Sequence, residues 1–196
     1  MTSEPVAAYP ARDQPARDQP ARDQYAKPLL VALLSGCGVA LAVGFYAKLH
    51  HPTKYALDVA GFSSPLYAKA WLTTAAVVFA VVQLITGARI TRRAAPAWMA
   101  TVHRWSGRIA ILLTVPVIIH CIYALGFGTY SARVIAHSVL GCVFYGAFVA
   151  KMLSLVRRDA MPKWVLPVLG GVVFVSLIGL WATSALWLFA TKGVHS

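Results

Sequence analysis

The amino-acid sequence predicts an all-α integral membrane protein, a polytopic bundle of five transmembrane helices that follows a disordered N-terminal tail. Apolar residues make up 59% of the 196 residues, and charged residues make up only 12%. A soluble globular domain carries about 25% charged residues. Five apolar segments each reach the roughly 20 residues that a helix needs to cross a ~30 Å hydrocarbon layer. We therefore divide the chain into a tail, residues 1–27, and a transmembrane domain, residues 28–196.

The tail differs from the rest of the chain in composition. Tandem copies of Pro-Ala-Arg-Asp-Gln begin at Pro10, Pro15 and Pro20. A period of five residues matches neither a helix nor a strand, and each proline removes a backbone donor. Because the repeat has almost no apolar side chains to bury, we expect it to be disordered.

The five apolar segments are expected to be helices, because an isolated strand would leave its backbone groups unpaired in lipid. Pro28 lies in the first turn of the first helix, where its missing donor costs little. That helix is expected to be a retained anchor, since its apolar stretch continues beyond the small-residue site at Ala40-Leu41-Ala42. The expected segments are Leu29–Leu49, Tyr67–Ile90, Arg104–Phe127, Arg133–Val156 and Trp164–Ala190.

Lysine and arginine are distributed unevenly between the two sides of the bundle. Thirteen of the 18 lie on the side of the N-terminal tail and five on the other. The richer side is expected to be cytoplasmic, which places the N-terminus inside the cell membrane and the C-terminus outside. The net charge of +12 is spread between apolar runs and forms no single stripe. The expected partner is therefore the lipid bilayer and not nucleic acid.

The scarcity of carboxylates excludes several classes of enzyme. Only six Asp and Glu residues occur, and four of them lie in the first 23 residues. Glycosidase, aspartic-protease and two-metal phosphoryl-transfer mechanisms need paired carboxylates in a folded core. The sequence also contains no nucleophile–base set for a hydrolase or transferase and no phosphate-binding glycine motif.

Cysteine and glycine are interpreted as packing residues. Cys37, Cys121 and Cys142 have no metal-ligand spacing and fall within the predicted spans, where cysteine is a common apolar filler. Glycines in the fourth and fifth segments are expected to allow close helix approach. These are Gly141, Gly146, Gly170, Gly171 and Gly179.

Two histidines form the principal candidate site. His120 lies 8.5 residues before the middle of the turn between the third and fourth segments, and His137 lies 8.5 residues after it. Both imidazoles are thus about 13 Å along their helices from this turn, in the outer half of the membrane. Two neutral imidazoles facing each other across an apolar bundle can ligate the iron of haem b. Arg133, one turn from His137, could pair with a haem propionate.

Other interpretations of the histidines remain open. A histidine in a membrane can simply bond a neighbouring helix, at about 0.6 kcal/mol on average, and the protein would then be a scaffold or subunit without cofactor. His50 and His51 could capture a metal ion at the outer end of the first helix. His103 is 17 residues, about 26 Å, from His120 and cannot share its iron. It marks either a helix start, an inner haem ligand or a quinone contact.

These residues resemble the b-type membrane cytochromes of the cytochrome b-561 and ferric-reductase-like kind. The similar parts are His103-Arg104-Trp105-Ser106-Gly107-Arg108, His120 and His137. The stretch from His137 through Gly141-Cys142 to Ala150-Lys151-Met152 also resembles a bacterial five-helix membrane family of unknown function. The first resemblance implies electron exchange with a quinol or an extracytoplasmic redox partner. The chain departs from two-haem members in having one histidine on the fourth helix, so only the outer haem site is expected.

Overall fold

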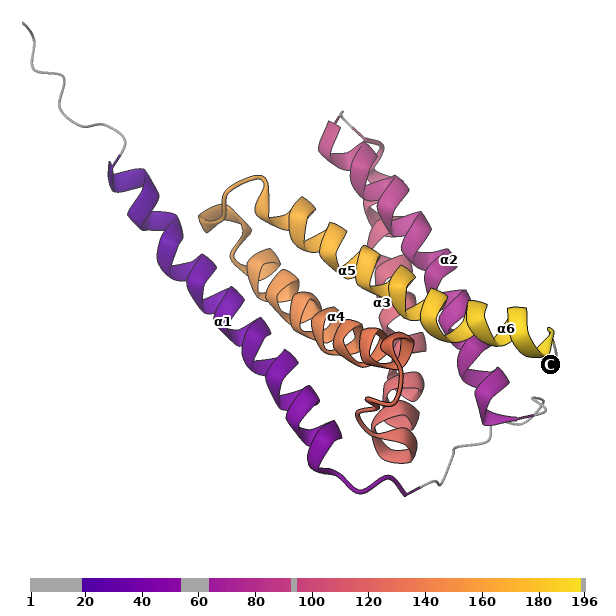
Figure 1. Ribbon diagram of the computed structural model, residues 1–196. Helices are drawn as coiled ribbons and strands as arrows, with labels where there is room; N and C mark the ends of the chain where they lie inside the picture. The colour runs from indigo at the N-terminus through magenta and orange to yellow at the C-terminus, as the bar shows by residue number, and fades with distance from the viewer. Residues whose placement is uncertain (1–18, 54–63, 93–94, 195–196) are drawn as a thin grey trace, which may run out of the picture.

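A computed structural model describes residues 19–53, 64–92 and 95–194, with side chains from Tyr25 onward. Throughout these residues the secondary structure is helical, as the sequence predicts (Figure 1). The main helices are α1 (Gln19–Leu49), α2 (Pro65–Arg92), α3 (Ala97–His120), α4 (Ala132–Val156), α5 (Val165–Trp181) and α6 (Trp187–Lys192). A π-helix, η1 (Cys121–Leu125), extends α3, and another, η3 (Ala182–Leu186), joins α5 to α6. A short 3-10 helix, η2 (Arg158–Ala160), precedes α5.

Five of these helical stretches are long and apolar enough to cross a membrane, which confirms the predicted architecture. They are Tyr25–Leu49, Pro65–Thr91, Ala97–Leu125, Ala132–Val156 and Val165–Lys192. Many large apolar side chains on them face outward, such as Phe45, Leu112 and Val175, each more than 60% exposed. A bilayer would cover such side chains, and the chain is an integral membrane protein.

The first helix begins earlier than the sequence indicates. It starts at Gln19 and not at Leu29, so Pro28 lies inside the helix. Residues between Pro20 and Pro28 include Ala, Arg, Gln and Lys, which are favourable helix formers, and this explains the extension. The rest of the predicted disordered tail, residues 1–18, lies outside the described residues.

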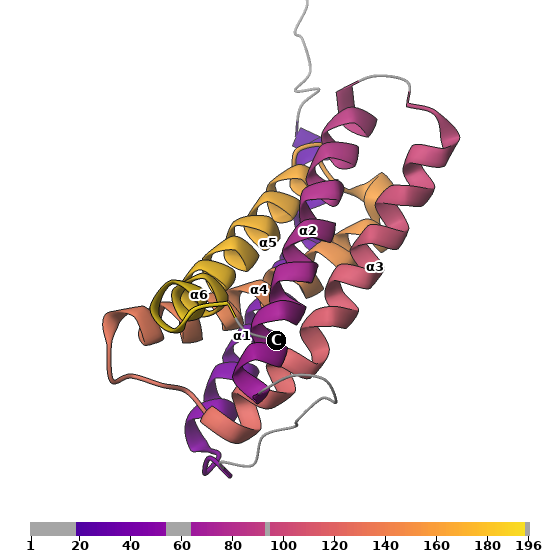
Figure 2. The ribbon, with the colours of Figure 1, turned by 90° about the vertical axis from the view of Figure 1, so that its right-hand side faces the viewer.

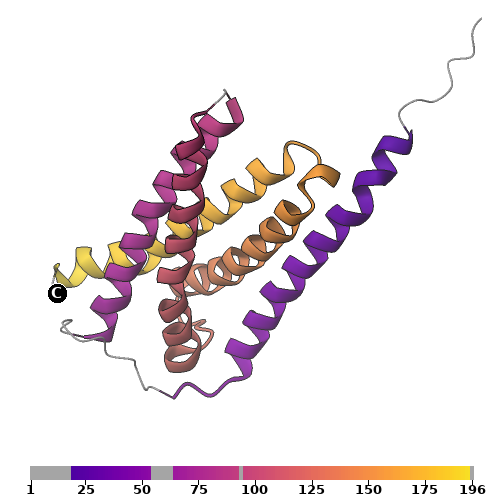
Figure 3. The ribbon, with the colours of Figure 1, turned by 180° about the vertical axis from the view of Figure 1, so that it is seen from behind.

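Helices that are neighbours in the bundle are often not consecutive in the chain. α4 lies between α1 and α5, and α2 pairs with α3 (Figures 1 and 2). α5 also packs against α2, where Trp181 Nε1 donates to Thr74 Oγ1 at 2.9 Å. The α1–α4 layer is thereby joined to the α2–α3 pair, as the view from behind shows (Figure 3). Although α3 and α4 are consecutive, they have few direct contacts with each other.

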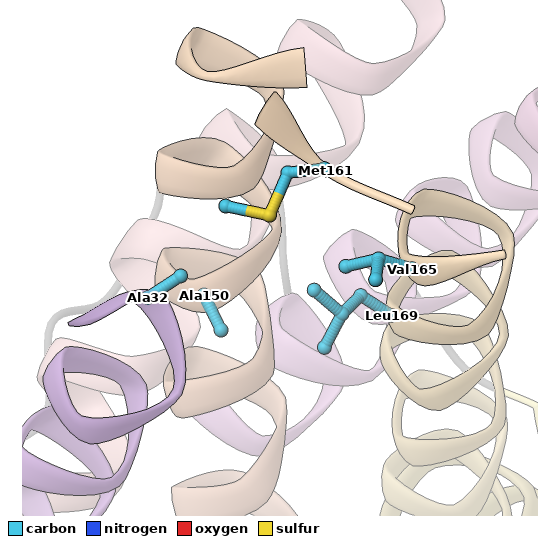
Figure 4. Packing of buried hydrophobic residues seen from close by; sticks show 5 residues of the cluster. All are labelled: Ala32, Ala150, Met161, Val165 and Leu169. Carbon is cyan, nitrogen blue, oxygen red and sulfur yellow. The ribbon is translucent and has the colours of Figure 1, made fainter. Parts of the chain in front are cut away.

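Small residues let α1 and α4 approach closely. A Cβ atom added to Gly146 would lie 2.6 Å from the carbonyl oxygen of Gly36, and a Cβ on Gly36 would lie 2.6 Å from that of Gly146. One turn away, Ala32 and Ala150 join Met161, Val165 and Leu169 in an apolar cluster that seals this end of the bundle (Figure 4). In lipid, such backbone proximity provides the van der Waals contact that holds helices together.

The glycine prediction is therefore confirmed at Gly146 and not at every position. A Cβ on Gly170 or Gly171 would meet nothing within 4 Å, so these two glycines serve no close approach among the described residues. Gly179 accommodates the side chain of Leu140, whose Cδ1 would lie 2.6 Å from an added Cβ.

Replacing Gly146 with alanine is expected to lower the unfolding temperature in detergent, at a cost of about 1–3 kcal/mol. The added Cβ would overlap a backbone oxygen, which cannot rotate away, so α1 must shift. Gly170→Ala is the matched control and is expected to leave stability unchanged or slightly raised, because alanine favours the helix. Equal unfolding temperatures for the two variants would contradict this account of the α1–α4 contact.

Candidate cofactor site

A cavity lies between α3 and α4, at the end of the bundle where these two helices are joined. It exists because α3 packs on α2 while α4 packs on α1 and α5, which leaves the facing surfaces of α3 and α4 apart. The space between these side chains, including its open mouth, is about 810 Å³. The wall is mainly apolar. It includes Val43 and Ala47 of α1, Val117 and Ile118 of α3, Ile122 of η1, Gly141 and Phe144 of α4, and Leu177 and Leu180 of α5.

His137 of α4 lines this cavity and is held from behind by Thr183 of η3. Nδ1 of His137 lies 3.0 Å from Thr183 Oγ1. The Thr183 hydroxyl donates its own proton to the carbonyl oxygen of Gly179 at 2.7 Å, so towards His137 it acts as an acceptor. This arrangement favours the tautomer with the proton on Nδ1 of His137, in which Nε2 has the lone pair that binds metals.

Both π-helical turns border the cavity. In η1, the amide of Gly126 donates to the carbonyl oxygen of Cys121 at 2.9 Å, a bond over five residues. Cys121 and Ile122 from this turn line the cavity, and η3 contributes Ser184 and positions Thr183. Single π-turns in α-helices frequently occur at functional sites. No sequence pattern indicated either of them.

His120 and His137 lie equally far, in residues, from the helix ends that face the turn between them. His120 precedes the end of η1, Leu125, by five residues, and His137 follows the start of α4, Ala132, by five residues. His120 is buried, with 7% of its surface exposed, but its side chain does not line the cavity. Cys121, the next residue after His120, lines the cavity together with His137 and Lys69. The structure therefore brings the two histidines to one region without pointing both into the cavity.

Arg133, which the sequence suggested as a partner for a haem propionate, does not line the cavity. Its guanidinium donates from Nη1 to the carbonyl oxygen of Thr183 and lies 3.8 Å from the ring centroid of Trp187. A hydrogen bond and a cation–π contact thus hold this cation against η3 and α6. The cation in the cavity wall is Lys69 of α2. In the sequence analysis, Lys69 entered only the count of Lys and Arg that predicts membrane orientation. Its position one turn inside an apolar helix could have marked it as a candidate site residue.

His103 lies at the opposite end of α3, outside the cavity. α3 begins at Ala97, so His103 lies inside the helix. One of its three interpretations, that it marks the start of the helix, is therefore wrong. Nδ1 of His103 lies 2.9 Å from Thr86 Oγ1, and Thr86 donates to the carbonyl oxygen of Val82 at 2.7 Å. Gln83 Nε2 donates to the carbonyl oxygen of His103. His103 is thus tied to α2 and is not brought together with His120 or His137.

The outer histidines of α1 form no metal site with a third ligand among the described residues. The His50 ring stacks on Tyr46 with centroids 5.4 Å apart and meets Tyr123 edge-on at 5.1 Å. His51 is exposed. His50 therefore helps to pack the end of α1 against η1.

The three cysteines are free thiols. Cys37 is exposed on the outer face of α1, whereas Cys121 and Cys142 line the cavity. Two of the residues interpreted as apolar fillers thus belong to the wall of the candidate site.

Comparison with known protein families assigns the chain to one of them. Residues 29–196 match the profile of a family of unknown function, DUF6529. The chain belongs to this family. No curated protein and no solved structure matches it. The match agrees with the resemblance to a family of unknown function, and it spans all five membrane helices of the DUF6529 chain. The resemblance to b-type cytochromes stays a prediction.

In this DUF6529 protein the site combines an apolar cavity, an imidazole with a free Nε2 and one cation. Such a set can hold a flat, mainly apolar group that offers a metal to the imidazole. The described wall of the cavity has no Asp or Glu side chain. Acid–base catalysis by a pair of carboxylates therefore has no residues there.

Proposed function

We propose that this membrane protein binds one haem b in the cavity between α3 and α4 and acts in electron transfer. His137 would hold the haem iron through its imidazole. The observation that carries the proposal is the hydrogen bond from His137 Nδ1 to Thr183, which leaves Nε2 as an unprotonated donor at the cavity wall. Histidines that ligate metals almost always have such a partner on the other ring nitrogen.

His120 is the proposed second ligand. Its support is its depth, equal to that of His137, and its position one residue before Cys121, which lines the cavity. Since His120 does not itself line the cavity, ligation requires its side chain to turn about the Cα–Cβ bond. A haem with two imidazoles supplies reversible one-electron oxidation and reduction, and both axial positions are then closed to oxygen.

The remaining residues would keep the group dry and oriented. Leu177, Leu180 and Phe144 supply apolar wall on the α4–α5 side. Tyr145 Oη donates to the carbonyl oxygen of Thr114 at 3.0 Å, which ties α4 to α3 beside the cavity. The electron partner is a quinol or an extracytoplasmic redox protein, because the site lies at the end of the bundle that the charge distribution places outside.

The absorbance spectrum of the detergent-purified protein, expressed with adequate haem supply, tests the proposal. We expect a Soret band, a low-spin reduced-minus-oxidised difference spectrum and no change on addition of carbon monoxide. A protein that folds but shows no Soret band would overturn the proposal in favour of a scaffold without cofactor.

Replacing Thr183 with valine is expected to weaken haem binding about 10- to 100-fold, the usual loss on removing the partner of a metal-binding histidine. Valine keeps the shape of the side chain and removes the acceptor for His137 Nδ1. Haem retention during dilution, followed by the Soret absorbance, measures the effect. Thr183→Ser keeps the hydroxyl and should behave as wild type. Thr86→Val, at the equivalent partner of His103, is the second control, and an equal loss there would contradict the assignment.

We further propose that the N-terminus is cytoplasmic and the C-terminus extracytoplasmic, from the thirteen-to-five distribution of Lys and Arg. Reporter fusions after Ser131 and after Ser196 are expected on the outside, and a fusion after Asp159 on the inside. A reporter after Asp159 that is found outside would contradict the proposed orientation in the membrane.

A further inference from the structure

Lys69 is the only cationic side chain in the described wall of the cavity. It is the fifth residue of α2, and Thr73, one turn further along α2, also lines the cavity. The Lys69 side chain is partly buried. Lys69 lines the same cavity as Cys121, which follows His120 in the chain, and His137 of α4. Lys69 therefore lies at the end of the bundle where the cavity opens.

This cation has no anionic partner within the part of the chain that the structure describes. The one ion pair there joins Arg158 to Asp159, at 3.7 Å, in the loop at the opposite end of α4. An ammonium group beside an apolar cavity loses part of its hydration, and pairing with an anion offsets that loss. A cavity occupant with an anionic group would supply the missing charge.

Arg133 is not available for this role. Its guanidinium is already bonded to the Thr183 carbonyl oxygen and packed on Trp187, and it does not line the cavity. Recruiting Arg133 to a ligand would break both contacts, whereas Lys69 has no hydrogen bond from Nζ to break among the described side chains.

We propose that Lys69 binds the carboxylate of the molecule that occupies the cavity, which under the proposed function is a propionate of haem. This inference rests on the proposed function and assigns to Lys69 the role that the sequence suggested for Arg133. Lys69 then orients the macrocycle, with its propionates toward the start of α2 and its metal toward His137. The positive charge beside the haem also favours the reduced iron, because it compensates the added electron.

Titration of the detergent-solubilised apoprotein with two porphyrins tests the assignment. Haem b carries two carboxylates, and its dimethyl ester carries none. Lys69→Gln is expected to weaken binding of haem b about tenfold, the effect of losing one hydrogen bond between charged groups, and to change binding of the dimethyl ester less than about twofold. Lys69→Arg should restore the preference for haem b. An optical redox titration should give a lower reduction potential for Lys69→Gln than for the wild type.

Two matched variants complete the experiment. Arg133→Gln is expected to weaken both porphyrins equally, because it loosens η3 and removes no ligand contact. Asp58 lies outside the described residues and is the carboxylate nearest to Lys69 in sequence. Asp58→Asn is expected to preserve the preference for haem b.

The outcomes separate this inference from the proposed function. If Lys69→Gln weakens both porphyrins alike, or neither, the carboxylate contact is overturned while haem binding stands. If Asp58→Asn abolishes the preference as Lys69→Gln does, Lys69 does not act on the propionate by itself and the assignment is overturned. If the wild type changes the Soret spectrum of neither porphyrin relative to detergent without protein, both the inference and the proposed function fail.

Discussion

Purified His137→Ala protein is expected to retain less than about a tenth of the haem that the wild type retains. Alanine removes the one imidazole that lines the cavity, which is the proposed iron ligand. An apolar cavity alone binds the macrocycle weakly, since the axial bond supplies most of the orientation and much of the affinity. The ratio of Soret to protein absorbance after size-exclusion chromatography measures the loss.

The control for this variant must show that the bundle still folds. The wild-type side chain makes one hydrogen bond, to Thr183, so its removal costs roughly 1 kcal/mol of stability and leaves a membrane bundle intact. His51→Ala, at an exposed position at the end of α1, is the matched histidine control and should keep full haem content. A folded His137→Ala protein with an unchanged Soret band would remove the basis of the haem site.

His120→Ala has a different expected result: haem is retained through His137 but changes its spin state. With one axial position vacated, the iron becomes five-coordinate and high-spin, and carbon monoxide then binds to the reduced form. The change is visible in the spectrum, because low-spin and high-spin haem differ in the positions of their Soret and visible bands. Added imidazole, which can enter the space left by the side chain, should restore the low-spin spectrum.

This experiment decides between one and two histidine ligands. The buried His120 ring does not line the cavity, so ligation depends on a side-chain rotation that the variant abolishes. A low-spin spectrum unchanged in His120→Ala would exclude His120 as the ligand and leave His137 with another partner. His103→Gln should leave the spectrum unaltered in either case, because His103 is tied to Thr86 at the other end of α3.

The same hydrogen-bond arrangement occurs at both ends of the bundle. A threonine that donates to the carbonyl oxygen four residues earlier accepts from Nδ1 of a histidine on a neighbouring helix, at Thr183–His137 and at Thr86–His103. Only His137 opens onto the cavity. Under the proposed function, the cavity beside His137, which His103 lacks, explains why His137 and not His103 is assigned as the ligand.

The candidate site was only partly predictable. His120 and His137 were found from their equal distances to a turn, which needs no more than the rise of a helix per residue. The roles of Arg133 and Lys69 could not be found in this way, because they depend on which helix lies opposite each side chain. Arg133 meets Thr183 and Trp187, about 50 residues further along the chain, and no periodicity encodes that meeting.

The sequence by itself determined the membrane class, the five helices and their approximate ends, because hydropathy is a local sum over about 20 residues. It also determined how many residues separate each histidine from the turn between the third and fourth spans. Only the tertiary structure decided that α4 packs mainly on α1 and α5, with few contacts to α3, that a cavity therefore opens between consecutive helices, and that Lys69 borders it. The physical reason is that apolar helices are equally compatible with lipid and with each other. Their partners are then selected by close fits such as Gly36 on Gly146, which form only between residues far apart in the chain.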